Sequence, residues 1–121
     1  MIEKIKGKKY LINGGLGMIG STTATILVKA GAEVTIVDAM IKPYGANLFN
    51  IEKIKDQVKI RTFDIKSIEN MKKEVEDKDV ILNLAGQIAH NDSIINPLYD
   101  AKLNYLYQLN VMEFIKQVNP N

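Results

Sequence analysis

The chain has 121 residues, of which 46% are hydrophobic and 25% are charged, values that are ordinary for one soluble globular domain. Its net charge of +2 is too small to indicate nucleic acid or an anionic membrane as a partner. Because the sequence contains no cysteine, it excludes disulfides, thiolate metal sites and cysteine nucleophiles.

The amino-terminal end, MIEKIKGKK, is too short and too charged for a signal peptide. No apolar run along the chain approaches the length of about 18 residues that a membrane-spanning helix needs. We therefore expect a cytoplasmic protein without a membrane partner.

The first predicted unit is a strand, a helix and a second strand. Residues 8–13 have the pattern of a strand, the apolar spacing from about Met18 to Ala30 is helical, and Gly31 is a suitable helix end. Glu33–Asp38 is a β-branched run of strand length. Such a βαβ unit predicts a right-handed crossover and a parallel sheet. The helical face expected to pack on the sheet contains Ile19, Thr23, Ile26, Leu27 and Ala30.

The turn between this strand and helix is rich in glycine. Gly15, Gly17 and Gly20 fit the dinucleotide-binding spacing G-x-G-x-x-G, and Gly14, Gly17 and Gly20 fit the variant G-x-x-G-x-x-G. In such turns one glycine allows the sharp change of direction, one lets the backbone approach a pyrophosphate, and one lets helix and strand pack closely. The helix that follows directs its free N–H groups at the phosphates.

Asp38 strengthens this interpretation. It lies at the end of the second strand, at close to the spacing expected for the acid that binds the adenosine ribose hydroxyls. A carboxylate there accepts hydrogen bonds from both hydroxyls and repels the 2′-phosphate of NADP. The alternative is that Asp38 only caps the turn that follows it.

The middle of the chain predicts a third strand and further helices. Residues 39–50 have the composition of a loop, and Asn47–Lys55 predicts a short helix. Val58–Phe63 predicts the third strand. Ser67 is a suitable cap for a helix that runs to about Glu76, with Asn70 where a capping box prefers Glu or Gln.

The last part of the chain predicts a fourth strand and a long helix. Residues 80–85, VILNLA, form an almost continuous apolar run, which predicts a strand covered on both faces. A polar loop, Ala85–Asp92, follows beside the expected cofactor crevice. Asn96 and Pro97 predict a helix start, and the helix is expected to run to about Val118 with more apolar surface than one sheet requires.

Taken together, these motifs resemble the amino-terminal half of an extended short-chain dehydrogenase/reductase of the NAD-dependent nucleotide-sugar epimerase/dehydratase family. NGGLGMIG at 13–20 resembles TGGxGFIG, DIKS at 64–67 is similar to D-[IVL]-x-D, and DVILNLAG at 79–86 resembles DxVxHLAA. SIINP at 93–97, followed by Asn104, matches the spacing S-x-x-N-P…N. YGANLFNI and LAGQ look most like UDP-glucose 4-epimerase-type proteins.

The resemblance implies a site for NAD. Asp38 would hold the adenosine ribose, Asp64 and Ile65 would bracket the adenine, and Asn104 would lie near the nicotinamide. The pyrophosphate would lie on Gly14, Gly15, Gly17, Met18 and Ile19. The middle of the cofactor would lie along Leu84, Ala85, Gly86 and Gln87. For Leu84, Ala85 and Asn104, packing or a helix hydrogen-bond network is the alternative role.

The family's catalytic pair, Tyr-x-x-x-Lys, is missing from this sequence. In the family the tyrosine moves the substrate hydroxyl proton and the lysine lowers the pKa of the tyrosine. Here the residues four positions after the five tyrosines are Gly14, Leu48, Leu103, Leu109 and Val111. The single histidine, His90, is expected to be a polar loop residue, and we expect no metal site. We therefore expect residues 1–121 to be an NAD-binding domain without the catalytic segment or the substrate domain.

These inferences predict an α/β fold, a truncated Rossmann fold with a parallel sheet in the order 3-2-1-4 and helices on both faces. The expected ligand is NAD, with a nucleotide sugar as the substrate of the full-length parent. An unpaired fourth strand and the apolar helix surface predict a homodimer or higher oligomer. Two alternatives are an NAD-sensing regulatory module and a structural α/β domain that binds nothing.

Overall fold

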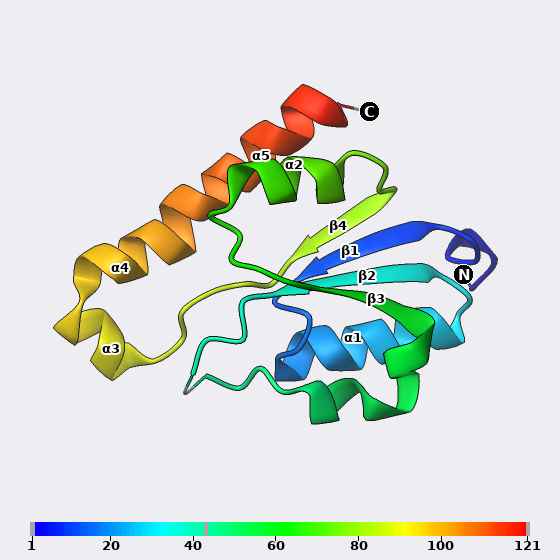
Figure 1. Cartoon of the computed structure of the whole chain (residues 1–121), viewed down its shortest axis with the longest axis horizontal. Helices are drawn as coiled ribbons and strands as arrows, with labels where there is room; N and C mark the ends of the chain where they lie inside the picture. The colour runs from blue at the N-terminus through cyan, green and yellow to red at the C-terminus, as the bar shows by residue number, and fades with distance from the viewer. Residues whose placement is uncertain (1, 43, 121) are drawn as a thin grey trace.

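The computed structural model describes residues 2–42 and 44–120, and in them a four-stranded parallel sheet lies between two helical layers (Figure 1). The order of the strands is β3-β2-β1-β4, as the sequence predicts. The strands are β1 (Lys9–Asn13), β2 (Glu33–Asp38), β3 (Val58–Thr62) and β4 (Val80–Asn83). Pro43, inside the predicted loop 39–50, lies outside the described residues.

Helices cover both faces of the sheet, which confirms the predicted layers. On one face lie α1 (Met18–Lys29) and the 3₁₀ helix η2 (Leu48–Gln57), and on the other lie α2 (Ile68–Val75) and α5 (Tyr107–Val118). A short 3₁₀ helix, η1 (Ile2–Lys4), precedes β1. The segment before α5 consists of α3 (His90–Ile95), α4 (Pro97–Ala101) and the π-helical turn η3 (Lys102–Leu106).

The alternating side chains of the central strands build a core on each side of the sheet. Leu11 of β1 is fully buried among residues of α2 and α5, and its neighbour Ile12 is fully buried against α1 and η2. The first core contains Leu11, Val37, Ile65, Met71, Val75, Leu103, Val111 and Phe114. The second contains Ile12, Leu16, Ala24, Leu27, Val34, Ile36, Ile51 and Ile54.

The buried face of α1 differs from the predicted one. Gly20, Ala24 and Leu27 face the sheet, whereas Ile19 and Ile26 are 63% and 60% exposed. The reason is the close approach at Gly20, where a Cβ atom would lie 2.6 Å from the Cα of the preceding turn's Gly15. This contact fixes the rotation of the helix and turns the two isoleucines away from the core.

Several predicted boundaries and details also change. The residues of β4 are all half-buried, and Ile81 packs against the first core while Leu82 packs against the second, so both faces of the strand are covered as expected, although β4 is an edge strand of the described sheet. The loop after β4 ends at Ala89, because α3 begins at His90. Ser67 begins α2 without a side-chain cap, since its Oγ accepts from Asn70 Nδ2 at 2.9 Å. None of the described helices has the length and apolar character to cross a membrane.

Candidate functional site

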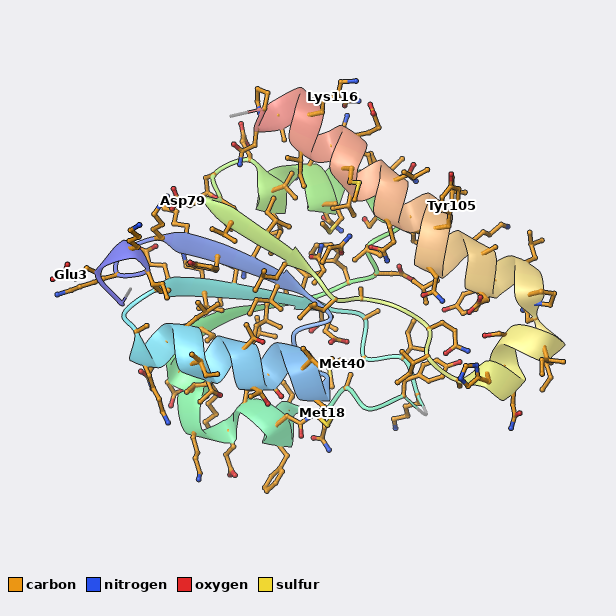
Figure 2. All side chains as sticks on the ribbon, turned by 180° about the vertical axis from the view of Figure 1, so that it is seen from behind. Glu3, Met18, Met40, Asp79, Tyr105 and Lys116 are labelled. Atoms are coloured by element: carbon orange, nitrogen blue, oxygen red, sulfur yellow. The ribbon has the colours of Figure 1, made fainter. Side chains whose placement is uncertain are left out.

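A cleft of about 750 Å³ lies at the carboxyl ends of the strands, a volume within the usual range for small-molecule sites. Figure 2 shows Met18 and Met40 near the carboxyl ends of the strands, with Glu3 and Asp79 near their amino ends. Most of the predicted site residues line the cleft, namely Gly14, Gly17, Met18, Ile19, Asp38, Asp64, Ile65, Leu84, Ala85 and Gly86.

Three predicted site residues do not line the cleft. Gly15 packs towards β2, because a Cβ atom on it would lie 2.6 Å from Ile36 Cγ2. Gln87 is buried, and its side chain bonds to the backbone N–H and C=O of Ala89 at 2.7 and 3.0 Å. Asn104 directs its amide at the backbone of Gln87. These residues shape the wall of the cleft from behind.

Gly14, Gly17 and Gly20 have different structural roles in the glycine turn. Gly14 has φ +73°, and a Cβ atom on it would lie 2.8 Å from Ala85 N. Gly20 provides the close contact between helix and turn. Gly17 is the N-cap of α1, and a Cβ atom there would meet only Gly14 O, at 3.5 Å. Because Gly15 also has no room for a Cβ atom, both glycine spacings describe the turn.

The amino-terminal end of α1 presents free backbone donors to the cleft. The first helical hydrogen bond runs from Ser21 N to Gly17 O at 2.9 Å. Within the described parts of the chain, the N–H groups of Met18, Ile19 and Gly20 have no acceptor. With the positive end of the helix dipole added, this end of α1 is suited to bind an anion such as a phosphate.

Asp38 connects the glycine turn to the loop after β2. Its Oδ2 accepts from Leu16 N at 3.0 Å, and its Oδ1 accepts from Met40 N at 2.9 Å. The second bond supports Met40 in the left-handed region, at φ 51°. The turn-capping role is thus present, but each carboxylate oxygen can accept a further hydrogen bond, and Asp38 also lines the cleft.

The far end of the cleft is formed by the loop after β3. The Oδ1 atom of Asp64 accepts from Lys66 N at 3.0 Å, and its Oδ2 lies 3.4 Å from Lys66 Nζ. Ile65 is buried against the core below. This arrangement places one apolar side chain and one carboxylate in the lining of the cleft.

Tyr44 lines the cleft and forms a hydrogen bond with Asp92 that was not predicted from the sequence. The Tyr44 hydroxyl donates to Asp92 Oδ2 at 2.6 Å and so joins the loop after β2 to α3. This hydrogen bond, together with burial and the negative charge of Asp92, raises the pKa of Tyr44 above its ordinary value. Further residues that line the cleft without having been predicted as site residues include Ser21, Thr22, Ile41, Asn50, Ile88 and Leu103.

The cleft offers backbone donors and carboxylate acceptors. No group of three His, Asp or Glu side chains in residues 2–42 and 44–120 could hold a metal ion. His90 is exposed at the first residue of α3. The free amides and the carboxylate of Asp38 instead offer donors for phosphate and acceptors for a diol.

Comparison with known proteins identifies the relatives of this chain. A profile of the GDP-mannose 4,6 dehydratase family matches residues 11–121. The chain belongs to this family. Among curated members of the wider group, CDP-paratose 2-epimerase from Salmonella typhi is 28% identical over 120 residues, which are 93% of this chain and 34% of the relative.

Solved structures share the fold of this chain. An epimerase from Methanothermobacter thermautotrophicus has a TM-score of 0.88 at 31% identity, with 98% of this chain and 34% of that chain covered. WbmF from Bordetella bronchiseptica, solved in complex with NAD+, has a TM-score of 0.84 at 24% identity, with 96% and 34% covered. The chain thus spans about a third of the length of these relatives, at their amino-terminal portion. The Rossmann fold and the resemblance to nucleotide-sugar epimerases and dehydratases are confirmed.

Proposed function

We propose that residues 1–121 are the NAD-binding domain of a nucleotide-sugar epimerase or dehydratase. The observation that carries the proposal is that the free amides of α1 and the carboxylate of Asp38 line one cleft. A dinucleotide carries both groups they suit, a pyrophosphate and a ribose diol. The family match supports the class of enzyme, and the fold shared with the NAD+ complex of WbmF supports the choice of cofactor. Bound NAD supplies hydride transfer.

The proposed roles follow the walls of the cleft. The pyrophosphate lies on Gly14, Gly17, Met18 and Ile19, with Gly15 fixing the turn behind them. The carboxylate of Asp38 holds the adenosine ribose, and the negative charge of Asp38 favours NAD over NADP. Asp64 and Ile65 bracket the adenine. The middle of the cofactor runs along Leu84, Ala85 and Gly86, with Gln87 and Asn104 behind this wall.

The proposed activity belongs to a longer protein. No tyrosine of this sequence is followed four positions later by lysine, and the lysine is what the family needs to activate its tyrosine. We expect the purified chain to bind NAD without turnover. Measurable epimerisation or dehydration of a nucleotide sugar by the 121-residue chain would overturn this expectation.

The binding proposal is tested by calorimetry with NAD, NADP, ADP-ribose and inorganic pyrophosphate. Asp38→Ala should weaken NAD and ADP-ribose by about 10- to 100-fold, because it removes charge-assisted hydrogen bonds to the diol. It should weaken pyrophosphate less, because pyrophosphate has no diol and is affected only through the loss of the hydrogen bond from Leu16 N to Asp38. Asp56→Ala, at an exposed acid of η2 outside the cleft, is the matched control. No NAD binding by the unmodified chain, or equal affinity in Asp38→Ala, would refute the assignment.

Two features of the intact protein remain proposals: its cytoplasmic location and its self-association. The second is supported by large apolar side chains exposed on α3, α4, η3 and α5, which are Ile94, Ile95, Leu98, Tyr105, Leu106, Leu109 and Met112. In addition, β4 pairs only with β1 among the described strands. Exposed apolar patches and unpaired strand edges both favour association.

A further inference from the structure

The loop at residues 84–89 forms one wall of the cleft without regular secondary structure. Its first amide, Leu84 N, donates to Asn13 O at 2.9 Å, which continues the pairing of β4 with β1. Beyond Leu84, no described strand offers hydrogen bonds to the backbone of the loop. The loop forms a wall of the proposed cofactor site, and its backbone must be held by groups other than a neighbouring strand.

Asn104 supplies part of that support. Its Oδ1 accepts from Gln87 N at 2.7 Å, and its Nδ2 donates to Gln87 O at 2.9 Å. One side chain thus pairs with both backbone groups of Gln87, as a neighbouring strand would do. The second Nδ2 hydrogen is directed to Asp100 Oδ1 at 3.0 Å, so both donors of Asn104 are in use.

Gln108 supports the same loop one turn farther along the helix. Its Nε2 donates to Ala85 O at 2.7 Å, and its Oε1 accepts from Asn83 Nδ2. The Oδ1 of Asn83 in turn accepts from Nδ2 of the fully buried Asn13 at 3.1 Å. A chain of three side-chain amides therefore runs from the end of β1 to the backbone of the cleft wall.

The π-helical turn η3 makes this arrangement possible. In it Tyr107 N donates to Lys102 O, five positions back, so Leu103 O lacks the donor that an α-helix would give it. Gln108 Nε2 donates a hydrogen bond to Leu103 O at 2.9 Å in addition to its hydrogen bond to Ala85 O in the loop. The wide turn thus orients the Gln108 amide between the helix and the loop.

We propose that Asn104 and Gln108, which we call the amide clamp, are positioning residues that hold loop 84–89 in the shape needed to bind the cofactor. Neither residue lines the cleft, so the clamp acts through the loop and not by contact with the ligand. The glycine at 86 fits this role, because a Cβ atom there would lie 3.0 Å from Asn104 Oδ1. The inference rests on the proposed function, since it takes the cleft to be the NAD site.

The test compares Asn104→Ala with Asn110→Ala. Asn110 is an asparagine of α5 for which the described chain shows no side-chain hydrogen bond. Asn104 is solvent-exposed and packs in neither core. Its replacement should therefore leave the melting temperature close to that of the control. Amide hydrogen exchange at Gln87 should become faster only in Asn104→Ala. Calorimetry should show about tenfold weaker NAD binding in Asn104→Ala and unchanged binding in Asn110→Ala.

The outcomes separate the clamp from the proposed function. If the unmodified chain binds NAD and Asn104→Ala binds it equally well, the clamp is overturned and the function stands. Unchanged exchange at Gln87 in Asn104→Ala would overturn the clamp as well. If the unmodified chain does not bind NAD, the proposed function is overturned and the inference is overturned with it.

Discussion

Gly17 and Gly20 belong to one turn, yet a methyl group should lower the stability of the fold at Gly20 and the affinity for NAD at Gly17. At Gly20 a Cβ atom would meet Gly14 O and Gly15 Cα, and these backbone atoms cannot move aside cheaply. At Gly17 the dihedral angles, φ −73° and ψ 176°, suit alanine, and the nearest atom is Gly14 O at 3.5 Å. Gly20 therefore serves packing, whereas Gly17 leaves open the space where we propose that the pyrophosphate binds.

The expected result is a separation of stability from binding. Gly20→Ala should lower the free energy of unfolding by about 1–3 kcal/mol in urea denaturation. Gly17→Ala should change it by less than about 0.5 kcal/mol but weaken NAD binding by roughly tenfold or more, because the methyl group occupies the space of the pyrophosphate. A stable Gly20→Ala protein, or a Gly17→Ala protein with full affinity, would contradict these roles.

At the scale of elements, the Tyr44–Asp92 hydrogen bond joins the loop after β2 to α3, two segments 48 positions apart in the sequence. The bond and the charge of Asp92 favour the neutral phenol, so the pKa of Tyr44 is higher in the folded chain than in the unfolded chain. The stability that the bond contributes is therefore complete below the unfolded pKa and is lost as the pH rises through the folded pKa.

Ultraviolet titration of the phenolate tests this coupling. Tyr44→Phe should remove the component that ionises at the highest pH, and Asp92→Asn should move that component back towards the ordinary tyrosine value. Tyr105→Phe is the control, because Tyr105 is largely exposed on the outer side of the helix (Figure 2). If Tyr105→Phe and Tyr44→Phe remove the same component, the hydrogen bond does not control the titration.

At the scale of the whole molecule, the exposed apolar side chains of α3, α4, η3 and α5 predict that the chain associates with itself. Leu98 of α4 and Met112 of α5 are 65% and 60% exposed. Light scattering of the unmodified chain should give the mass of a dimer or a higher oligomer, and Leu98→Lys with Met112→Lys should shift the mass towards the monomer. Phe49→Lys, at a 73% exposed residue of η2 on the opposite face of the sheet, should leave the mass unchanged. A clean monomer mass for the unmodified chain would refute the association.

Local chemistry made much of this molecule predictable. Glycines at 14, 17 and 20 are compatible with a tight turn and a close helix contact, and the β-branched run at 33–38 is compatible with a buried strand. Asn96 and Pro97 started a helix as expected, with Asn96 Oδ1 accepting from Tyr99 N at 3.1 Å. These features depend on residues close in sequence, so the sequence contains all the information they need.

What the sequence by itself determined was the order of the elements, the parallel sheet and the position of Asp38 and the glycine turn at one edge. Only the tertiary structure decided which face of α1 is buried, where η3 widens the long helix, and how Asn104 and Tyr44 reach partners 17 and 48 positions away. The spacing of apolar residues predicts that a helix has an apolar side. Close contacts such as that at Gly20 determine which side of the helix faces the sheet. Hydrogen bonds between distant segments exist only after the layers have packed.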